Sequence, residues 1–360
     1  MLPVFLSKNP VLRFINESIY DAHAYNFWLK KINTLASVNN EMLARIVDKK
    51  MCSQDMLSLT LHCNRYVNFG QAGQHHLIKA NINGRNYERS YSLTQLDSTH
   101  LQLHVKKVPQ GIVSTWLCEQ AKIGDTLALG QPFGEVQIHN FNCKNLVLLA
   151  AGSGITPIYS LIHDLVQKNQ LRDYQIQLFY WAKTQADLAF VAQFTAWQQR
   201  YSSQFKVHFF TTQQAPFHPR LNHQSAHILG DLSQSSVFAC GSADFVNNAA
   251  HLAQTAQQFQ GEAFHLNTAS QLDPHATVQL RLEKSKQTLS IPKGQSILAA
   301  LEAAKIPAKH GCRMGICNSC SCKKMTGSSQ NLQNFAVNHE PNQMLRICVH
   351  SAQSDLVLDL

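Results

Sequence analysis

The sequence predicts a multi-domain protein of mixed class, in which an antiparallel β-barrel is followed by a parallel α/β domain and a small C-terminal domain. Short alternating strands separated by turn residues occupy about residues 44–129, and strands alternate with helices from about residue 145. Four cysteines with a distinctive spacing lie near the C-terminus. A chain of 360 residues is also too long for one hydrophobic core, so two or three domains are expected.

Composition and charge limit the function classes. The net charge of +9, from 31 basic and 22 acidic residues, favours an acidic protein partner or an anionic membrane surface. Nucleic acid is disfavoured, because no basic run with interleaved aromatic residues and no reader motif occurs. The longest apolar run, Leu146–Ala151, is too short to cross a bilayer, and the N-terminus lacks the charged-then-apolar order of a secretory signal. We therefore expect a cytoplasmic protein with reduced cysteines, either free or at the inner face of the membrane.

Residues 1–40 are expected to form an N-terminal helical extension, because apolar residues recur there at intervals of three and four. Two interpretations are open. The extension could dock on a membrane or partner through its aromatic residues and adjacent lysines, or it could pack against the following barrel. The residues concerned are Tyr25, Phe27, Trp28, Lys30 and Lys31.

The first domain, residues 41–142, is predicted to be the antiparallel barrel. Turn residues such as Asn83-Gly-Arg and Gln110-Gly separate its strands. The predicted strands are 44–48, 57–63, 76–82, 88–93, 101–107 and 126–129.

The second domain, residues 143–270, is predicted to be the parallel α/β sheet. Its predicted strands are 146–151, 175–181, 205–211 and 236–239, with helices after the first strand and near 188–200. A polar linker at Thr268–His275 leads to the third domain, residues 271–360. That domain is predicted to contain strands at 277–283, 287–292 and 321–325 and a helix at 296–304.

Cys312, Cys317, Cys320 and Cys348 have the spacing C-x4-C-x2-C followed by one distant cysteine. This is the plant-type ligand pattern of a [2Fe–2S] cluster, with Gly315 allowing a tight turn in the loop. Zinc is disfavoured because structural zinc sites usually use two C-x2-4-C pairs, and disulfides are disfavoured in a reducing compartment. A surplus thiol follows two residues after Cys320, and we interpret it as a small buried hydrophobe.

The barrel contains two elements that suit a phosphate-bearing heterocycle. Arg89-Ser-Tyr-Ser92 lies on a predicted strand, where a guanidinium, a ring and a hydroxyl can bind a phosphate and a flat ring. Gly111-Ile-Val-Ser114 opens a predicted helix, whose free N–H groups can bind a pyrophosphate. Each has an ordinary alternative: a salt-bridging Arg with a half-buried Tyr, and simple helix capping by Ser114.

These two elements, together with Gly130-Gln-Pro-Phe-Gly134, resemble the flavin-binding domain of the ferredoxin–NADP reductase family. The resemblance implies FAD, with Tyr91 against the isoalloxazine, Ser92 near its reactive nitrogen and Arg89 on the pyrophosphate. Tyr91 and Ser92 are thereby implied as catalytic residues. The implied FAD-contacting positions are Arg89, Ser90, Tyr91, Ser92, His104, Val105, Lys106, Gly111, Ile112, Val113 and Ser114.

The strand Leu146–Ala151 breaks into a glycine turn and continues as a predicted helix that begins at Pro157. Glycines let a backbone approach a pyrophosphate, although an ordinary strand-to-helix turn is the alternative. The turn resembles the family's nicotinamide-binding turn, and Cys240-Gly-Ser242 resembles its second nucleotide contact, with Cys240 as a catalytic position near the nicotinamide. The implied contacts are Gly152, Ser153, Gly154, Ile155, Thr156, Pro157, Cys240, Gly241 and Ser242.

Lys183 follows the second strand of this domain, where relatives carry a basic residue near the adenosine ribose, and Arg220 follows the third. Both could pair with a 2′-phosphate, so NADPH is favoured over NADH. One departure from the family concerns the docking of the nicotinamide ring and not the binding of its phosphates. Residues 264–269 replace the acidic residue and the aromatic residue that many relatives carry after the last strand.

The order of flavin, nicotinamide and β-grasp ferredoxin domains resembles that of single-chain oxygenase and desaturase reductases. The resemblance implies electron flow from NADPH through FAD and [2Fe–2S] to a separate terminal oxygenase. The segment Tyr25–Asn33 resembles the electron-transfer partners of membrane fatty acyl-CoA (stearoyl-CoA) desaturases, which makes a desaturase the first choice of acceptor. A soluble di-iron or Rieske oxygenase is the alternative, and a non-catalytic Fe–S redox sensor is an alternative of another class.

The third domain has ten basic residues and five acidic ones between residues 275 and 360. Arg313, Lys323 and Lys324 lie closest in sequence to the cluster ligands. We expect these three to surround the electron exit and to steer an acidic acceptor or an anionic membrane. A solvated basic surface without a partner is the alternative.

Overall fold

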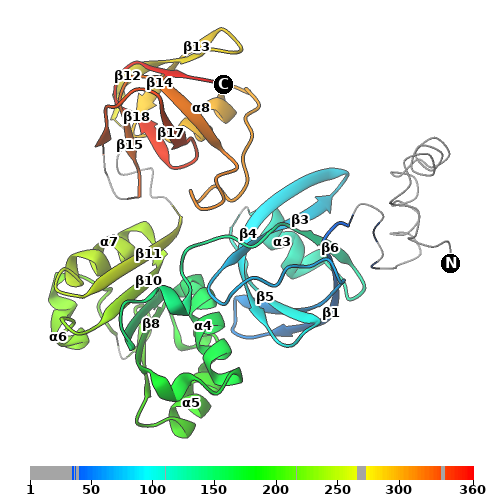
Figure 1. Ribbon diagram of the computed structural model, residues 1–360, viewed down its shortest axis with the longest axis vertical. Helices are drawn as coiled ribbons and strands as arrows, with labels where there is room; N and C mark the ends of the chain where they lie inside the picture. Colours follow the sequence, from blue (N-terminus) through cyan, green and yellow to red (C-terminus); the bar gives the residue numbers. More distant parts are fainter. Residues whose placement is uncertain are drawn as a thin grey trace.

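In the computed structural model, the described residues are 35, 37, 40–109, 111–215, 217–265, 273–333 and 337–360. They form a closed barrel, a five-stranded parallel sheet and a C-terminal pair of sheets (Figure 1). The expected N-terminal helix lies outside the described residues, as does most of the expected linker. In the described part of the chain, no helix is long and apolar enough to cross a membrane.

The barrel closes in the order β1-β2-β5-β4-β3-β6, and each pairing is antiparallel. Every predicted strand of this domain is present. A two-residue turn joins β3 to β4, with Asn83 at φ 51° and Gly84 at φ 78°, which is the left-handed geometry that tight hairpins favour. The strands are β1 (Leu43–Met51), β2 (Met56–Cys63), β3 (His75–Ile82), β4 (Arg85–Gln95), β5 (His100–Lys106) and β6 (Thr126–Leu129).

The second domain is a parallel sheet in the order β11-β10-β7-β8-β9, with apolar cores on both faces. Helices α4 (Ile155–Gln167) and α5 (Val191–Arg200) cover one face, and α6 (Ala226–Leu229) and α7 (Ala243–Leu252) cover the other. Helix α4 begins at Ile155, two residues before the predicted start at Pro157. Pro157 lies in the first turn, where backbone N–H groups have no partner within the helix, so its lack of an N–H costs no hydrogen bond. The strands are β7 (Asn145–Ala151), β8 (Gln175–Ala182), β9 (Phe205–Thr211), β10 (Ser236–Ser242) and β11 (Gln258–His265).

The barrel packs directly on the α/β domain. Met56 of β2 belongs to the same apolar cluster as α4 and α5. The Ser160 hydroxyl of α4 donates to the Leu93 carbonyl of β4 at 2.9 Å, and the Gln54 N–H donates to the Ala186 carbonyl at 2.8 Å. These contacts, with the bond from the Gln167 side chain to the Leu96 carbonyl at 3.0 Å, set the end of β4 along helix α4.

The C-terminal domain has a five-stranded sheet in the order β13-β12-β19-β14-β17 and a small sheet β16-β15-β18. Helix α8 (Ile297–Ala303) packs on its core, and the loop before β14 reaches towards the barrel (Figure 1). Strands of two to four residues carry no usable periodicity, so the sequence did not predict them. The strands are β12 (Asp273–Leu282), β13 (Gln287–Lys293), β14 (Ser321–Thr326), β15 (Ser329–Asn331), β16 (Val337–Asn338), β17 (Gln343–Arg346), β18 (His350–Ala352) and β19 (Leu356–Leu358).

Candidate functional site

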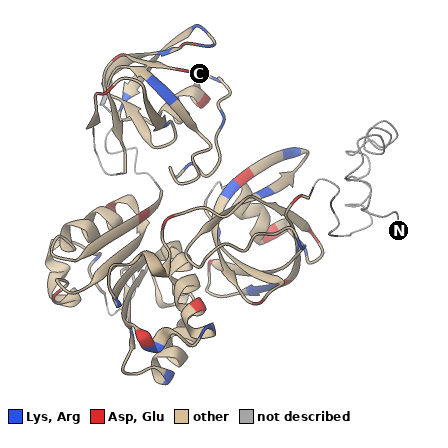
Figure 2. Ribbon diagram, viewed as in Figure 1, with Lys and Arg blue, Asp and Glu red and all other residues tan. Residues whose placement is uncertain are grey.

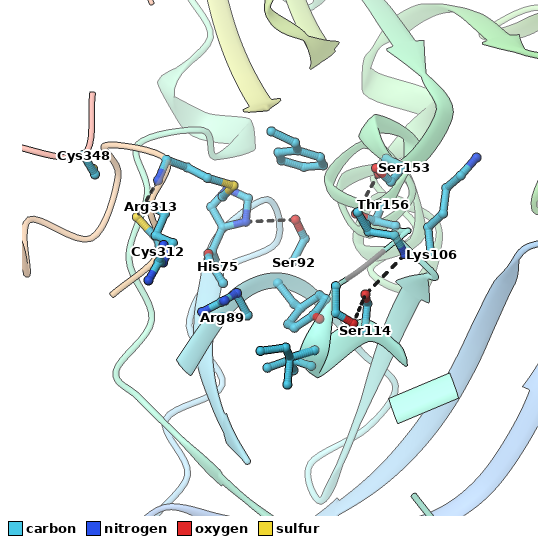
Figure 3. Close-up of a pocket in the computed structure, with 18 of the residues that line it drawn as sticks. His75, Arg89, Ser92, Lys106, Ser114, Ser153, Thr156, Cys312, Arg313 and Cys348 are labelled. Carbon is cyan, nitrogen blue, oxygen red and sulfur yellow. Dashed lines mark hydrogen bonds between the residues drawn. The ribbon is translucent and has the colours of Figure 1, made fainter. Parts of the chain in front are cut away.

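A cavity of about 430 Å³ lies where the three domains meet (Figure 3). Its walls hold most of the barrel residues that the sequence predicted, two residues of the glycine turn and two of the predicted cluster ligands. These predicted residues are Arg89, Ser90, Tyr91, Ser92, His104, Lys106, Gly111, Ile112, Val113, Ser114, Ser153, Thr156, Cys312 and Cys348.

The other predicted site residues lie outside this cavity wall. Val105 is fully buried and points into the barrel core. The rest are also absent from the lining of the cavity. They are Gly152, Gly154, Ile155, Pro157, Lys183, Arg220, Cys240, Gly241, Ser242, Cys317 and Cys320.

Arg89 and Tyr91 form one wall of the cavity on strand β4. The Arg89 guanidinium donates to the Glu88 carbonyl at 2.8 Å, and burial together with the nearby Arg313 lowers its pKa. Burial raises the pKa of Tyr91, so its phenol stays neutral. A cationic group beside a neutral aromatic ring suits a ligand with a phosphate and a flat ring.

Three side chains of the cavity wall, Ser90, His104 and Arg313, have buried polar atoms without a hydrogen-bond partner among the described residues. Both ring nitrogens of His104 and the hydroxyl of Ser90 lack a hydrogen bond among the described residues. Burial lowers the pKa of His104 to about 3, so the imidazole is neutral. Buried polar groups are normally paired, so these atoms indicate that a ligand supplies hydrogen-bonding groups here. The residues present therefore fit a flavin.

Ser114 does not cap the short helix α3 (Ile112–Thr115), whose N-cap is Gly111. Its hydroxyl instead accepts from the Val108 N–H at 3.2 Å and donates to the Gly111 carbonyl at 3.3 Å. Ser114 thus stabilises a turn that lines the cavity. The alternative prediction, in which Ser114 caps the helix, is wrong.

Three side chains at the cavity edge, Ser92, His75 and Glu262, are linked by hydrogen bonds. The sequence analysis had identified Ser92 as a site residue but not His75 or Glu262. The Ser92 hydroxyl lies 2.9 Å from His75 Nδ1, and His75 Nε2 lies 3.0 Å from a carboxylate oxygen of Glu262 on β11. The ring of Phe264 lies edge-on to His75 and lines the cavity. Phe264 opens the segment that the sequence analysis describes as a departure from the family, and residues 266–269 of that segment lie outside the described residues, so that expectation stays a prediction.

The glycine turn packs tightly against strand β10. A Cβ at Gly154 would lie 2.0 Å from the Cys240 carbonyl oxygen, so only glycine fits there. Cys240 is fully buried, and burial together with the Glu262 charge raises the pKa of its thiol. Its thiol is protonated and therefore suits a packing role beside the turn, not thiolate chemistry. Ser242 caps α7 by accepting from the Phe245 N–H at 3.4 Å.

Lys183 and Arg220 are exposed near the carboxyl ends of β8 and β9, away from the cavity. The indole N–H of Trp181 donates to the Pro219 carbonyl at 3.3 Å, and the Gln213 N–H donates to the Lys183 carbonyl at 2.8 Å. These bonds hold both basic residues at the same edge of the sheet.

The four predicted cluster cysteines lie together in two pairs. The Cys312 N–H donates to the Cys317 sulfur at 3.2 Å, and the sulfurs of Cys320 and Cys348 are 3.1 Å apart. The Cys312 sulfur accepts backbone N–H groups from Met314, Ile316 and Cys317 at 3.3 to 3.4 Å. Two thiol pairs in a cage of N–H donors fit a two-iron cluster, in which each iron takes two thiolates. All ten cysteines are free.

Gly315 has a φ of 73° in the cluster loop, as the predicted tight turn requires. The predicted surplus thiol, Cys322, is only 6% exposed and packs in the domain core as expected.

The expected basic ring around the cluster is wrong for Lys324, because this side chain is buried. Lys324 is 1% exposed, and its ammonium donates to the backbone and side-chain oxygens of Asn338. Arg313 turns to the cavity, where it pairs with Glu302 at 2.5 and 3.0 Å. Of the two lysines, Lys323 is the exposed one, because neighbouring residues of β14, the strand with the blue band in Figure 2, face opposite ways.

Comparisons with known proteins agree with this architecture. Three family models match: an oxidoreductase FAD-binding domain at residues 43–138, an oxidoreductase NAD-binding domain at 148–251 and a 2Fe-2S iron-sulfur cluster binding domain at 280–353. The NADPH oxidoreductase of Mycobacterium tuberculosis is 28% identical over 330 residues, which cover 89% of this chain and 84% of that protein. The glycine betaine monooxygenase reductase subunit of Pseudomonas aeruginosa is 21% identical over 364 residues, covering 92% and 99%.

The solved structure of phthalate dioxygenase reductase has the same fold, with a TM-score of 0.60 and 22% identity over 89% of this chain and 98% of that chain. The chain is thus an oxidoreductase with FAD-binding, NAD-binding and 2Fe-2S domains in that order. The predicted fold class is confirmed.

Proposed function

We propose that this three-domain oxidoreductase oxidises NADPH and delivers single electrons from its [2Fe–2S] cluster to a separate terminal oxygenase. The observation that carries the proposal is the shared cavity, whose wall holds the flavin-motif residues, Ser153 and Thr156 of the glycine turn, and the thiols Cys312 and Cys348. A bound flavin supplies the conversion between a two-electron hydride donor and a one-electron acceptor.

The residues have distinct proposed roles around that cavity. Arg89 neutralises a cofactor phosphate, while the neutral His104 and the Ser90 hydroxyl hydrogen-bond the flavin. Ser92 would lie near the reactive nitrogen of the flavin, and the turn from Gly111 to Ser114 would contact its phosphates, since all of these residues line the cavity. Cys312 and Cys348 hold the cluster at the cavity, so the electron path between the two groups is short.

NADPH is proposed over NADH because Lys183 and Arg220 provide two exposed cations at one edge of the nucleotide domain. A 2′-phosphate is best held by fixed positive charge. The name of the M. tuberculosis relative, an NADPH oxidoreductase, supports the same choice.

For the terminal acceptor we propose a membrane fatty acyl-CoA desaturase, on the resemblance of residues 25–33 to the electron donors of such enzymes. A soluble oxygenase is the second candidate, because a relative that covers 92% of this chain is a monooxygenase reductase subunit. Anaerobic mixing with NADPH should bleach the flavin and then the cluster bands within seconds. NADPH oxidation should then speed up with the true acceptor, and a protein that binds NADPH without bleaching would be a sensor instead.

A further inference from the structure

Arg313 of the C-terminal domain and Arg89 of the barrel face the same cavity. Both line its wall, and Figure 3 shows them at the end of the cavity where Cys312 lies. Burial and then the nearby Arg313 charge lower the pKa of Arg89, so the two guanidinium groups are close enough to repel each other. Two cations from different domains therefore share one end of the cavity.

The bonds of Arg313 within its own domain leave one buried nitrogen unused. Its two terminal nitrogens donate to the Glu302 carboxylate at 3.0 and 2.5 Å, and His310 Nε2 lies 2.8 Å from one of them. His310 Nδ1 lies 2.9 Å from the Ala308 carbonyl, so Nδ1 carries the hydrogen and Nε2 accepts from Arg313. The Nε atom of Arg313 is buried and has no hydrogen-bond partner among the described residues. Because buried polar groups are normally paired, we expect a ligand in the cavity to be that partner.

The charges at this end of the cavity favour an anion. Arg89 and Arg313 supply two positive charges, and Glu302, which also lines the cavity, supplies one negative charge. These three side chains therefore leave one positive charge uncompensated. Lys106 lines the cavity as well, but it pairs with Asp55 at 2.6 Å. Guanidinium groups match the geometry of phosphate oxygens, so a phosphate is the anion that suits this pair of arginines.

The C-terminal domain meets the barrel at the cavity without sharing a core with it. Its apolar core is separate, whereas Met56 of the barrel belongs to the core of the α/β domain. Helix α8 and the cysteine loop both reach the cavity wall, through residues such as Leu298 and Met314. A ligand in the cavity thus contacts the C-terminal domain and the barrel together.

We infer that Arg313 binds a phosphate of FAD together with Arg89, so that the C-terminal domain helps the barrel to hold the cofactor. The inference rests on the proposed function, which puts FAD in this cavity and its pyrophosphate on Arg89. Glu302 and His310 position the Arg313 side chain, and Nε is the donor that remains for the phosphate. Arg313 therefore couples the docking of the C-terminal domain to flavin binding.

The test is the dissociation constant of FAD, measured by equilibrium dialysis of the complete chain with its cluster. Arg313→Gln removes a cation from the phosphate site, so FAD should bind about tenfold or more weakly, the effect of one lost charge-assisted hydrogen bond. The Fe–S absorbance of the variant verifies that the cluster is retained.

Glu302→Gln should change FAD binding in the opposite direction. It removes the negative charge but keeps a side-chain oxygen that can accept from Arg313, so FAD should bind about two- to fivefold more tightly, as expected for one partly exposed charge. The sign separates charge from structure, because an ion pair that only supported the fold would weaken FAD binding in both variants. If Arg313→Gln loses the cluster, the sign of the change in Glu302→Gln decides the inference.

Arg281→Gln is the matched control. Arg281 pairs with Glu283 at 3.1 Å in the same domain but does not line the cavity, so FAD affinity should stay unchanged. Unchanged FAD binding in Arg313→Gln with an intact cluster would overturn the inference, and so would unchanged or weaker binding in Glu302→Gln. Absence of FAD from the unmodified protein would instead refute the proposed function.

Discussion

The sulfur of Cys320 lies 3.1 Å from that of Cys348, although the two residues are 28 positions apart in the sequence. Cys312 and Cys317 form the second pair. One thiol of each pair, Cys312 and Cys348, lines the cavity, whereas Cys317 and Cys320 do not. Cys312 and Cys348 would therefore hold the proposed cluster at the wall of the cavity.

Cys317→Ser should abolish the visible Fe–S absorbance and electron transfer to cytochrome c, because one iron loses a thiolate. FAD should stay bound, since Cys317 lies outside the cavity wall. Ferricyanide reduction by NADPH should largely survive, because ferricyanide can take electrons from the flavin. Absorbance spectra and the two assays measure these outcomes.

Cys322→Ser is the matched control, because this buried thiol lies two residues from a ligand but belongs to the domain core. It should keep the cluster. Loss of ferricyanide reduction in Cys317→Ser with FAD intact would contradict the proposed order of electron flow.

Lys183→Ala should weaken NADPH more than NADH, by about 1.5 to 3 kcal/mol if the ammonium bonds the 2′-phosphate. The ratio of kcat/KM values for the two nucleotides measures this difference. Lys206→Ala is the control, because Lys206 lies at the opposite end of β9 and is also exposed. An equal loss for both nucleotides would show that Lys183 makes no such contact.

Lys323→Glu and Lys324→Glu should behave differently although the residues are adjacent. Lys324→Glu places a carboxylate against the Asn338 oxygens in a buried position, at a cost of about 3 to 5 kcal/mol, and should destabilise the domain and its cluster. Lys323→Glu changes an exposed charge and should keep the cluster. Thermal unfolding and the Fe–S absorbance of both variants measure this contrast.

Lys323→Glu also tests the steering of an acidic acceptor. Turnover with the true acceptor should fall, and turnover of the unmodified protein should decline with salt as exposed charges are screened. NADPH-to-ferricyanide activity serves as the internal control and should stay unchanged. Turnover that is indifferent both to salt and to this substitution would rule out steering by Lys323.

His104→Phe should make the protein less sensitive to acid. Burial lowers the His104 pKa from 6.5 to about 3, so between these values the unfolded chain binds a proton that the folded protein does not. The free energy of unfolding therefore falls as pH falls, by about 2 kcal/mol between pH 7 and pH 5. Phe keeps the ring contacts with Tyr159 and Phe190 but cannot titrate.

Denaturant unfolding at the two pH values, followed by fluorescence of the barrel and α/β domains, measures the difference. His139→Phe, which removes an exposed imidazole, should keep the pH dependence of the unmodified protein. If His104→Phe loses as much stability on acidification as the unmodified protein, His104 does not stay neutral in the folded state.

Local patterns determined much of the fold. The alternation of the barrel strands, the glycine turn after β7 and the cysteine spacing each depend on residues close in sequence, and all appear as predicted. The contact between His75 and Ser92 could also have been predicted from the sequence. The two-residue turn at Asn83-Gly84 fixes the register of β3 against β4, and that register places His75 opposite Ser92.

Only the tertiary structure decided which side chains of different domains contact one another. Glu262 reaches His75 from 187 positions away, and no periodicity links the two. Lys324 and Arg313 are basic in the sequence, yet one is buried against Asn338 and the other pairs with Glu302 at the cavity. Hydrophobic patterns specify which face of an element is buried, whereas the partner of a polar group depends on how separately folded domains pack. The sequence thus determined the domains and cofactor motifs, and the packing determined which side chains meet at the site.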